Sequence, residues 1–321
     1  MDFLTFEDLQ ARFQELYRHQ AYQEALELAK ENSESFPEYS HLLYYWRISL
    51  AARLGDSDQA IALLNDVLQT GFWYGEVLLR KSPSLKSLQG DPAFEHLVEM
   101  NRLLREKDPE QKYPLLLLRS QGRCQAGGPA CPAMIALHTN AGSAQDSVEF
   151  WQPVASQGWL VGVPQSSQAM WKGAYIWDNY EIAESEVRKA FESMIEKYAV
   201  DRQRVILGGH SMGGETAMRL ALEGGIGTLG FIAVGPAGPF MDDLDRWLPA
   251  IHAGQNLGLR GYLLAGEEDE SIEHENIQAL FEMFNQNGVI CELEEIPLAG
   301  HEYSPEYESA MLRALEFVDQ K

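Results

Sequence analysis

Residues 204–222 read RVILGGHSMGGETAMRLAL, and this stretch decides how the C-terminal two thirds of the chain fold. Residues 205–208 form a short apolar run, which predicts a buried strand. Residues 215–222 carry apolar side chains at helical spacing. The glycines around Ser211 tolerate a strained turn and let the helix approach the strand closely. The stretch therefore predicts a strand, a tight turn and a helix, with Ser211 in the turn.

The same alternation continues on both sides of this stretch. Short apolar runs bounded by Gly, Pro and Asn predict strands at residues 113–119, 134–138, 159–163, 205–208, 229–234, 260–265 and 290–296. Helical patterns separate most of them, including one that Asp178 can cap and a single helix near residues 241–253. Strands that alternate with helices imply a mostly parallel sheet covered on both faces. We predict an α/β fold for this half.

The first hundred residues have a different period. Residues 5–106 have helical patterns throughout, and aligning Ala25 with Ala60 gives a repeat of about 35 residues. The small residues Ala25, Ala29 and Ala60, with Gly55 at a turn, resemble those of a tetratricopeptide repeat, although His19 and Phe72 depart from its consensus. About two units and a cap are present. The resemblance implies either a peptide-binding groove or a helical appendage that packs on the other half.

Residues 106–112 are polar, contain a proline and predict the linker. We therefore expect a helical domain at residues 1–108 and an α/β domain at residues 109–321.

Composition limits the partners and the compartment. The net charge is −23, and both halves carry more acidic than basic side chains, so nucleic acid and anionic membranes are unfavourable partners. No apolar run is long enough to span a bilayer, and the acidic N-terminus lacks a secretory pattern. The three cysteines, Cys124, Cys131 and Cys291, predict reduced thiols and a cytoplasmic protein without a bound metal.

Ser211 stands in the pattern G-x-S-x-G between a strand and a helix, which is typical of a catalytic nucleophile. A serine hydroxyl needs a histidine base that a carboxylate orients. With this context, residues 113–321 resemble the α/β-hydrolase superfamily, particularly its carboxylesterase, phospholipase-like and dienelactone-hydrolase-like members.

The resemblance implies the chain order serine, acid, histidine, and His301 is the histidine that follows the last strand. The turn after residues 260–265 reads GEEDE, and the family pattern G-x-x-D places the acid at Asp269. A shift of one residue in register would select Glu268 or Glu270 instead.

The resemblance also implies two backbone donors for an oxyanion. One is the N–H of Met212, the residue after the nucleophile. The other is the N–H of Asn140, because residues 137–142 (LHTNAG) are similar to the esterase pattern H-G-x-G, with Thr139 replacing the first glycine. We interpret His138 as a structural histidine bonded to backbone.

No cap domain interrupts residues 235–259, so we expect an open site unless the N-terminal helices cover it. Aromatic and apolar residues in loops after the strands are candidate pocket walls: Trp171, Tyr175, Trp177, Phe240 and Met241.

The sequence thus predicts a serine hydrolase of carboxylic esters or thioesters that acts on a small molecule without a cofactor. The alternatives are an aminopeptidase-like peptidase, a non-hydrolytic acyltransferase, or a peptide-binding scaffold whose hydrolase half is inert. A peptide or protein partner would bind through the N-terminal helices.

Overall fold

The computed structural model describes residues 5–108, 116–118, 124–125, 127–303 and 305–320. The chain divides into two compact units. The helical unit comprises Met1–Lys112 together with Ala169–Lys172, and the sheet unit comprises Tyr113–Gln168 and Gly173–Lys321. The four residues 169–172 therefore belong to the helical unit although they follow a strand of the sheet unit in the sequence.

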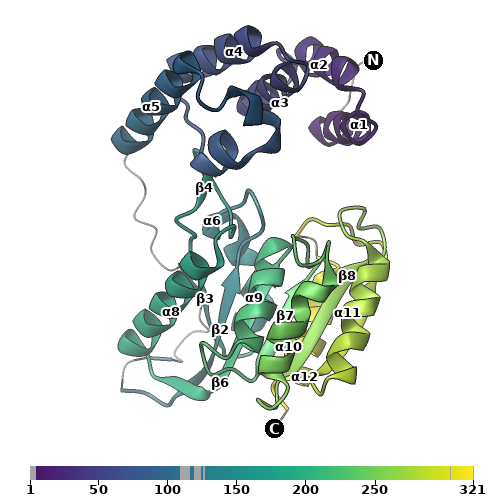
Figure 1. Ribbon diagram of the computed structural model, residues 1–321. Helices are drawn as coiled ribbons and strands as arrows, with labels where there is room; N and C mark the ends of the chain where they lie inside the picture. The colour runs from purple at the N-terminus through teal and green to yellow at the C-terminus, as the bar shows by residue number, and fades with distance from the viewer. Residues whose placement is uncertain (1–4, 109–115, 119–123, 126, 304, 321) are drawn as a thin grey trace. The chain divides into compact units, whose positions relative to one another are not determined.

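In its described residues, the helical unit consists of five α-helices and three short helical turns, followed by one short strand (Figure 1). The helices and turns are α1 (Phe6–Arg18), α2 (Tyr22–Glu31), η1 (Pro37–Tyr39), α3 (Ser40–Arg53), α4 (Ser57–Gln69), η2 (Val77–Lys81), η3 (Pro83–Leu88) and α5 (Pro92–Lys107). Thr5, Asp56 and Asp91 cap α1, α4 and α5, because each side chain accepts a backbone N–H of the first turn. The alanines of the predicted repeat, Ala25, Ala29 and Ala60, are fully buried where small side chains let helices approach.

A short strand, β4 (Ala169–Trp171), completes the helical unit. Gly75 donates its N–H to the Met170 carbonyl at 2.6 Å. A side chain at Gly75 would collide with the Ala169 carbonyl, so only glycine permits this approach. The Trp171 ring packs at 5.5 Å from that of His41.

Among its described residues, the sheet unit contains a seven-stranded sheet in the order β1-β3-β2-β6-β7-β8-β9. Neighbouring strands run parallel except for the edge pair β1 and β3, which is antiparallel. The strands are β1 (Leu116–Leu118), β2 (Cys131–Leu137), β3 (Leu160–Val163), β6 (Val200–His210), β7 (Gly230–Val234), β8 (Arg260–Gly266) and β9 (Ile290–Ile296); the two-residue β5 (Ala174–Tyr175) lies outside this sheet.

Helices cover both faces of this sheet (Figure 1). One face carries α8 (Tyr180–Lys197), α9 (Met212–Leu222), η5 (Leu244–Trp247), α10 (Leu248–Gly254) and α11 (His274–Gln286). The other carries α6 (Ala144–Ser147), η4 (Val148–Trp151), α7 (Gln152–Ser156) and α12 (Tyr307–Val318). Along β2, Ile135 and Leu137 face the first layer while Met134 and Ala136 face the second, which explains the continuous apolar runs.

The predicted fold class is confirmed: a mostly parallel sheet with helices on both faces, together with an all-α N-terminal region. β9 has the predicted bounds, whereas β6 begins at Val200, earlier than its apolar run, because β2 pairs with it as far as that residue. Residues 109–112 of the predicted linker lie outside the described residues. The similarity of the helices to tetratricopeptide repeats stays a prediction.

Two local predictions are wrong. Asn179, not Asp178, caps α8, because its side chain accepts the N–H of Ile182. Cys124 and Cys131 form a disulfide rather than two reduced thiols, and Cys291 is the buried free cysteine among the described residues. Within that same part of the chain, no helix is both long and apolar enough to cross a bilayer.

Candidate active site

Ser211 lies in a sharp turn between β6 and α9. Its backbone has φ 55° and ψ −123°, a left-handed region that non-glycine residues rarely adopt, and such strain concentrates at functional positions. The Ser211 N–H donates to the carbonyl of Val234 on the neighbouring strand, at 2.9 Å. A Cβ on Gly209 would stand 2.2 Å from the Gly213 carbonyl oxygen. Only glycine at position 209 therefore lets the strand and the helix approach this closely, as the sequence predicts.

His301 and Asp269 complete a hydrogen-bonded chain that begins at Ser211. The Ser211 Oγ lies 2.9 Å from His301 Nε2, and His301 Nδ1 lies 2.8 Å from Asp269 Oδ2. A carboxylate can only accept, so Nδ1 carries the proton and Nε2 is free to accept the serine hydroxyl. The three side chains belong to the segments that follow β6, β8 and β9, and they are separated by up to 90 residues in the sequence.

The Asp269 carboxylate is buried and fixed on both sides. Its side chain is inaccessible to solvent, and its second oxygen accepts the Ser271 N–H at 2.9 Å. Gly235, at φ 47°, leaves room for it, because a Cβ there would come within 3.1 Å of Asp269 Oδ2. Glu268 and Glu270, the alternative acids, are exposed.

Aromatic rings pack against His301 on the side of His210. The His210 and His301 ring centroids are 5.0 Å apart, and Tyr303 lies 4.4 Å from His210. Burial lowers the pKa of His210 to about 3, which makes this ring a weaker proton acceptor than an ordinary histidine. Phe150 contacts Tyr303 from η4 at 4.5 Å. Sequence reasoning missed both Phe150 and Tyr303, although Tyr303 follows His301 by two residues.

The two predicted oxyanion donors belong to segments that meet at the serine turn. Met212 begins α9, so its N–H belongs to the first turn and has no carbonyl within the helix to bond. Leu137 at the end of β2 is in register with Gly209 of β6, and the loop that contains Asn140 follows it directly. A Cβ on Gly213 would lie 2.4 Å from the His138 carbonyl oxygen, which shows how closely the two segments approach.

The candidate pocket residues have other contacts. Trp171 is partly buried and packs against the core of the helical unit, and Met241 lies in the core of the sheet unit. Trp177 is buried and donates its indole N–H to the His138 carbonyl at 3.0 Å, while the Tyr175 ring contacts His138 edge-on. Phe240 is half-buried against Trp247. Each of the five candidate pocket residues therefore has packing partners of its own, and these contacts do not bring the five together around Ser211.

Glu215 is a further buried carboxylate one helical turn beyond the serine. It accepts the N–H groups of Phe240 and Met241 at 2.9 and 3.1 Å, and so ties the loop after β7 to α9. Burial raises its pKa to about 7, against the lowering effect of these two bonds. Its position in the helical pattern after Ser211 gave no signal of this role, since the loop partner is 25 residues away.

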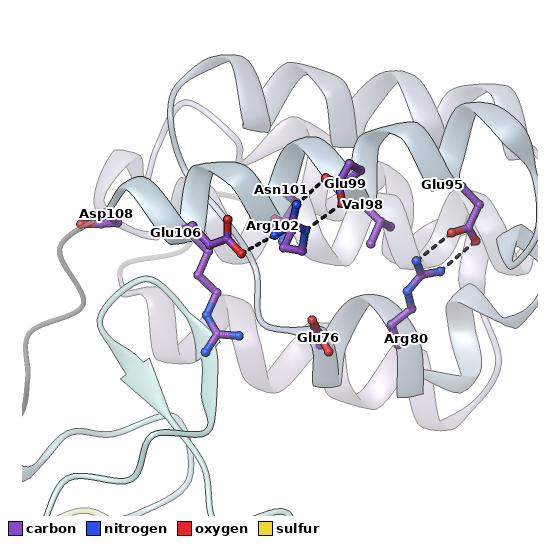
Figure 2. Close-up of a pocket in the computed structure, with 10 residues that line it drawn as sticks. Glu76, Arg80, Glu95, Val98, Glu99, Asn101, Arg102, Glu106 and Asp108 are labelled. Atoms are coloured by element: carbon purple, nitrogen blue, oxygen red, sulfur yellow. Dashed lines mark hydrogen bonds and ion pairs between the residues drawn. The ribbon is translucent and has the colours of Figure 1, made fainter.

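The helical unit has a hollow of about 770 Å³ between η2 and α5, lined mainly by charged side chains (Figure 2). Arg80 makes a two-pronged ion pair with Glu95, and Arg102 pairs with Glu99 and Glu106. Arg80 and Arg102 therefore both have glutamate partners within the lining. In the described part of the chain, no group of three or more His, Cys, Asp or Glu side chains is placed to hold a metal ion.

Comparison with known proteins gives a family match for the helical segment and solved structures of similar fold. Residues 5–109 match a family described as the A/B hydrolase-like N-terminal domain. An uncharacterized protein from Bacillus cereus ATCC 10987 is similar over 99% of this chain and 100% of its own, with 21% identity and a TM-score of 0.54. A dienelactone hydrolase-like promiscuous phosphotriesterase, P91 from metagenomic libraries, is similar over 64% of this chain and 92% of its own, with 14% identity and a TM-score of 0.51. The sheet unit has the α/β-hydrolase fold.

At these identities the similarity establishes the fold, and it confirms the resemblance that the serine turn predicted. The family match adds that the helical segment is one that recurs beside such folds. No curated protein matches the chain.

Proposed function

We propose that this α/β hydrolase cleaves carboxylic esters or thioesters through an acyl-enzyme on Ser211. The observation that carries the proposal is the relay from Ser211 Oγ to His301 Nε2 and from His301 Nδ1 to Asp269. This arrangement supplies a nucleophile, a base and an orienting acid in the geometry that acyl transfer needs.

The reaction begins when Ser211 Oγ attacks the substrate carbonyl carbon and its proton passes to His301 Nε2. The imidazolium that forms is stabilised by the buried Asp269 carboxylate. Negative charge develops on the carbonyl oxygen, where the N–H groups of Met212 and Asn140 would donate. The positive end of α9 favours the same charge.

The intermediate collapses when the alcohol or thiol leaves and takes the proton from His301. Water then attacks the acyl-enzyme, gives its proton to His301 and releases the acid, while Ser211 regains its hydrogen. His301 acts as base and then acid in each half, which requires a ring held in one tautomer. The bond to Asp269 supplies that constraint.

The test is hydrolysis of p-nitrophenyl esters of increasing acyl length, beside the matching thioesters and aminoacyl p-nitroanilides. We expect ester or thioester turnover that Ser211→Ala removes and that the surface control Ser156→Ala retains. Faster cleavage of the anilides than of the esters would reassign the site to a peptidase. Absence of turnover by folded native protein on all three series would contradict the proposal.

A further inference from the structure

His138 is a fully buried histidine at the end of β2, outside the relay of Ser211 and His301. Its Nδ1 lies 2.8 Å from the Thr139 carbonyl oxygen. Its Nε2 lies 3.3 Å from the Ser166 backbone nitrogen and 3.1 Å from Gln165 Nε2. Both ring nitrogens therefore have partners, and these partners differ in kind.

The partners determine the tautomer of the ring. A carbonyl oxygen only accepts, so Nδ1 must carry the hydrogen that is donated to Thr139. A backbone N–H and an amide NH₂ only donate, so Nε2 must be unprotonated. Burial lowers the pKa of His138 to about 4, and the ring is neutral at physiological pH. His138 is thus held as the Nδ1–H form.

The bond to Thr139 fixes the direction of the next N–H group. The carbonyl of Thr139 and the N–H of Asn140 belong to one planar trans peptide, so they point in opposite directions. The Gly142 N–H donates to the same carbonyl at 3.2 Å, and the backbone N–H of Tyr175 donates to the Gly142 carbonyl at 3.0 Å. The peptide between residues 139 and 140 is therefore held from one side.

We propose that His138 is a positioning residue for the oxyanion site, which aims the Asn140 N–H through the hydrogen bond from its Nδ1–H to the Thr139 carbonyl. This inference rests on the proposed function of Ser211. It adds a donor-orienting group that acts through the backbone and touches no substrate.

The surroundings of His138 are built to hold it in place. Gln165 reaches it with the side-chain amide, whose oxygen accepts the Ala144 N–H at 2.8 Å. The indole of Trp177 donates to the His138 carbonyl, and its ring packs 4.8 Å from the imidazole. Ala141, at φ 58°, stores backbone strain in the loop that these bonds maintain. Several independent contacts thus converge on one peptide orientation.

The experiment compares two substitutions at one position, with esterase kinetics as readout. His138→Leu removes the donor, whereas His138→Asn can place an amide N–H near the position of Nδ1. We expect His138→Leu to lower kcat on the order of 10²-fold with little change in KM, because the loss falls on the transition state. His138→Asn should recover most of that loss. His252→Asn, at an exposed histidine, is the matched control.

The outcomes separate this inference from the proposed function. If native protein neither hydrolyses esters nor reacts at Ser211, the proposed function fails before any variant is measured. If native protein is active, then native kcat in folded His138→Leu, or equal losses in the Leu and Asn variants, would overturn the positioning role.

A measurement on native protein covers the case in which His138→Leu does not fold. Imidazole ¹⁵N–¹H spectra should show His138 in the Nδ1–H form, unchanged between pH 6 and 8. The Nε2–H form, or titration in that range, would overturn the inference.

Discussion

The serine turn of the sheet unit and the charged hollow of the helical unit are both polar, but their polar groups are arranged for different ends. In the hollow, Arg80 and Arg102 lie against glutamates that neutralise them. At the serine turn, the Ser211 hydroxyl donates to His301, and His301 donates to the Asp269 carboxylate. The backbone of Ser211 is strained, and glycines flank it. The ion pairs of the hollow neutralise charge, whereas the hydrogen bonds at the serine turn prepare the Ser211 hydroxyl to react.

The serine turn also differs from the hollow in how tightly its backbone is packed. Gly209, Gly213 and Gly235 are positions where an added Cβ would meet backbone or relay atoms. The hollow's ion pairs are formed by exposed side chains, whose energies are small because water and salt screen them. Substitutions at the turn should therefore have larger effects than substitutions in the hollow, and four predictions test this order.

The largest expected effect is on Asp269. Asp269→Asn removes the carboxylate that selects the His301 tautomer, so we expect kcat/KM for esters to fall about 10⁴-fold with the fold retained. The neighbouring Glu268→Gln, at an exposed acid in the same turn, should stay close to native. A comparable loss of kcat/KM in both variants would mean that activity depends on the conformation of the turn and not on the Asp269 carboxylate.

Gly213→Ala comes next. The added methyl would lie 2.4 and 2.5 Å from the carbonyl oxygens of His138 and Leu137, so α9 or the loop after β2 must shift. We expect a free energy of unfolding lower by about 3 kcal/mol and a slower reaction at Ser211. Gly227→Ala, where nothing lies within 4 Å of the new carbon, is the control measured by the same denaturant titration. Equal stability of the two variants would contradict the close approach.

Glu215 should make stability depend on pH. Its folded-state pKa is raised to about 7 from 4.5, so its contribution is full below pH 4.5 and is lost as the pH rises through 7. The free energy of unfolding of the native chain relative to Glu215→Gln should fall by about 3 kcal/mol across that window. Urea titrations at several pH values measure the difference, with the exposed Glu192→Gln as control. If the difference in unfolding free energy between the native chain and Glu215→Gln does not vary with pH, the pKa of Glu215 is not raised in the folded state.

The smallest effect is expected in the hollow. Arg80 lowers the pKa of Glu95 to about 2, but the pair is exposed to solvent. Glu95→Gln should leave kcat and KM unchanged, with a thermal midpoint close to native. Loss of ester turnover in this variant would show that the hollow takes part in catalysis and would break the contrast between the two regions.

Much of the sheet unit could be predicted from the sequence because apolar periodicity reports burial directly. β9 has the predicted bounds, and the chain order of Ser211, Asp269 and His301 follows the strand ends that the apolar runs mark. The polar start of β6 could not be found in this way, since Val200 pairs with Cys131 through backbone and the side chains of residues 200–204 are not fully buried.

What the sequence did not predict depends on contacts between distant residues. Both Asp178 and Asn179 are good caps, and only the backbone at the helix start selects one. The partners of His138 lie 27 and 28 residues away, and those of Glu215 lie 25 and 26 residues away. Trp171 follows a strand of the sheet unit in the sequence but packs against the core of the helical unit. Periodicity carries no information on such pairings.

The central claim is that Ser211 is an activated nucleophile. Reaction of native protein with a fluorophosphonate, followed by peptide mass spectrometry, tests it most directly. The relay predicts one adduct per chain, located on Ser211, absent in Ser211→Ala and formed far more slowly in Asp269→Asn. An adduct on another residue, or none on folded native protein, would contradict the account.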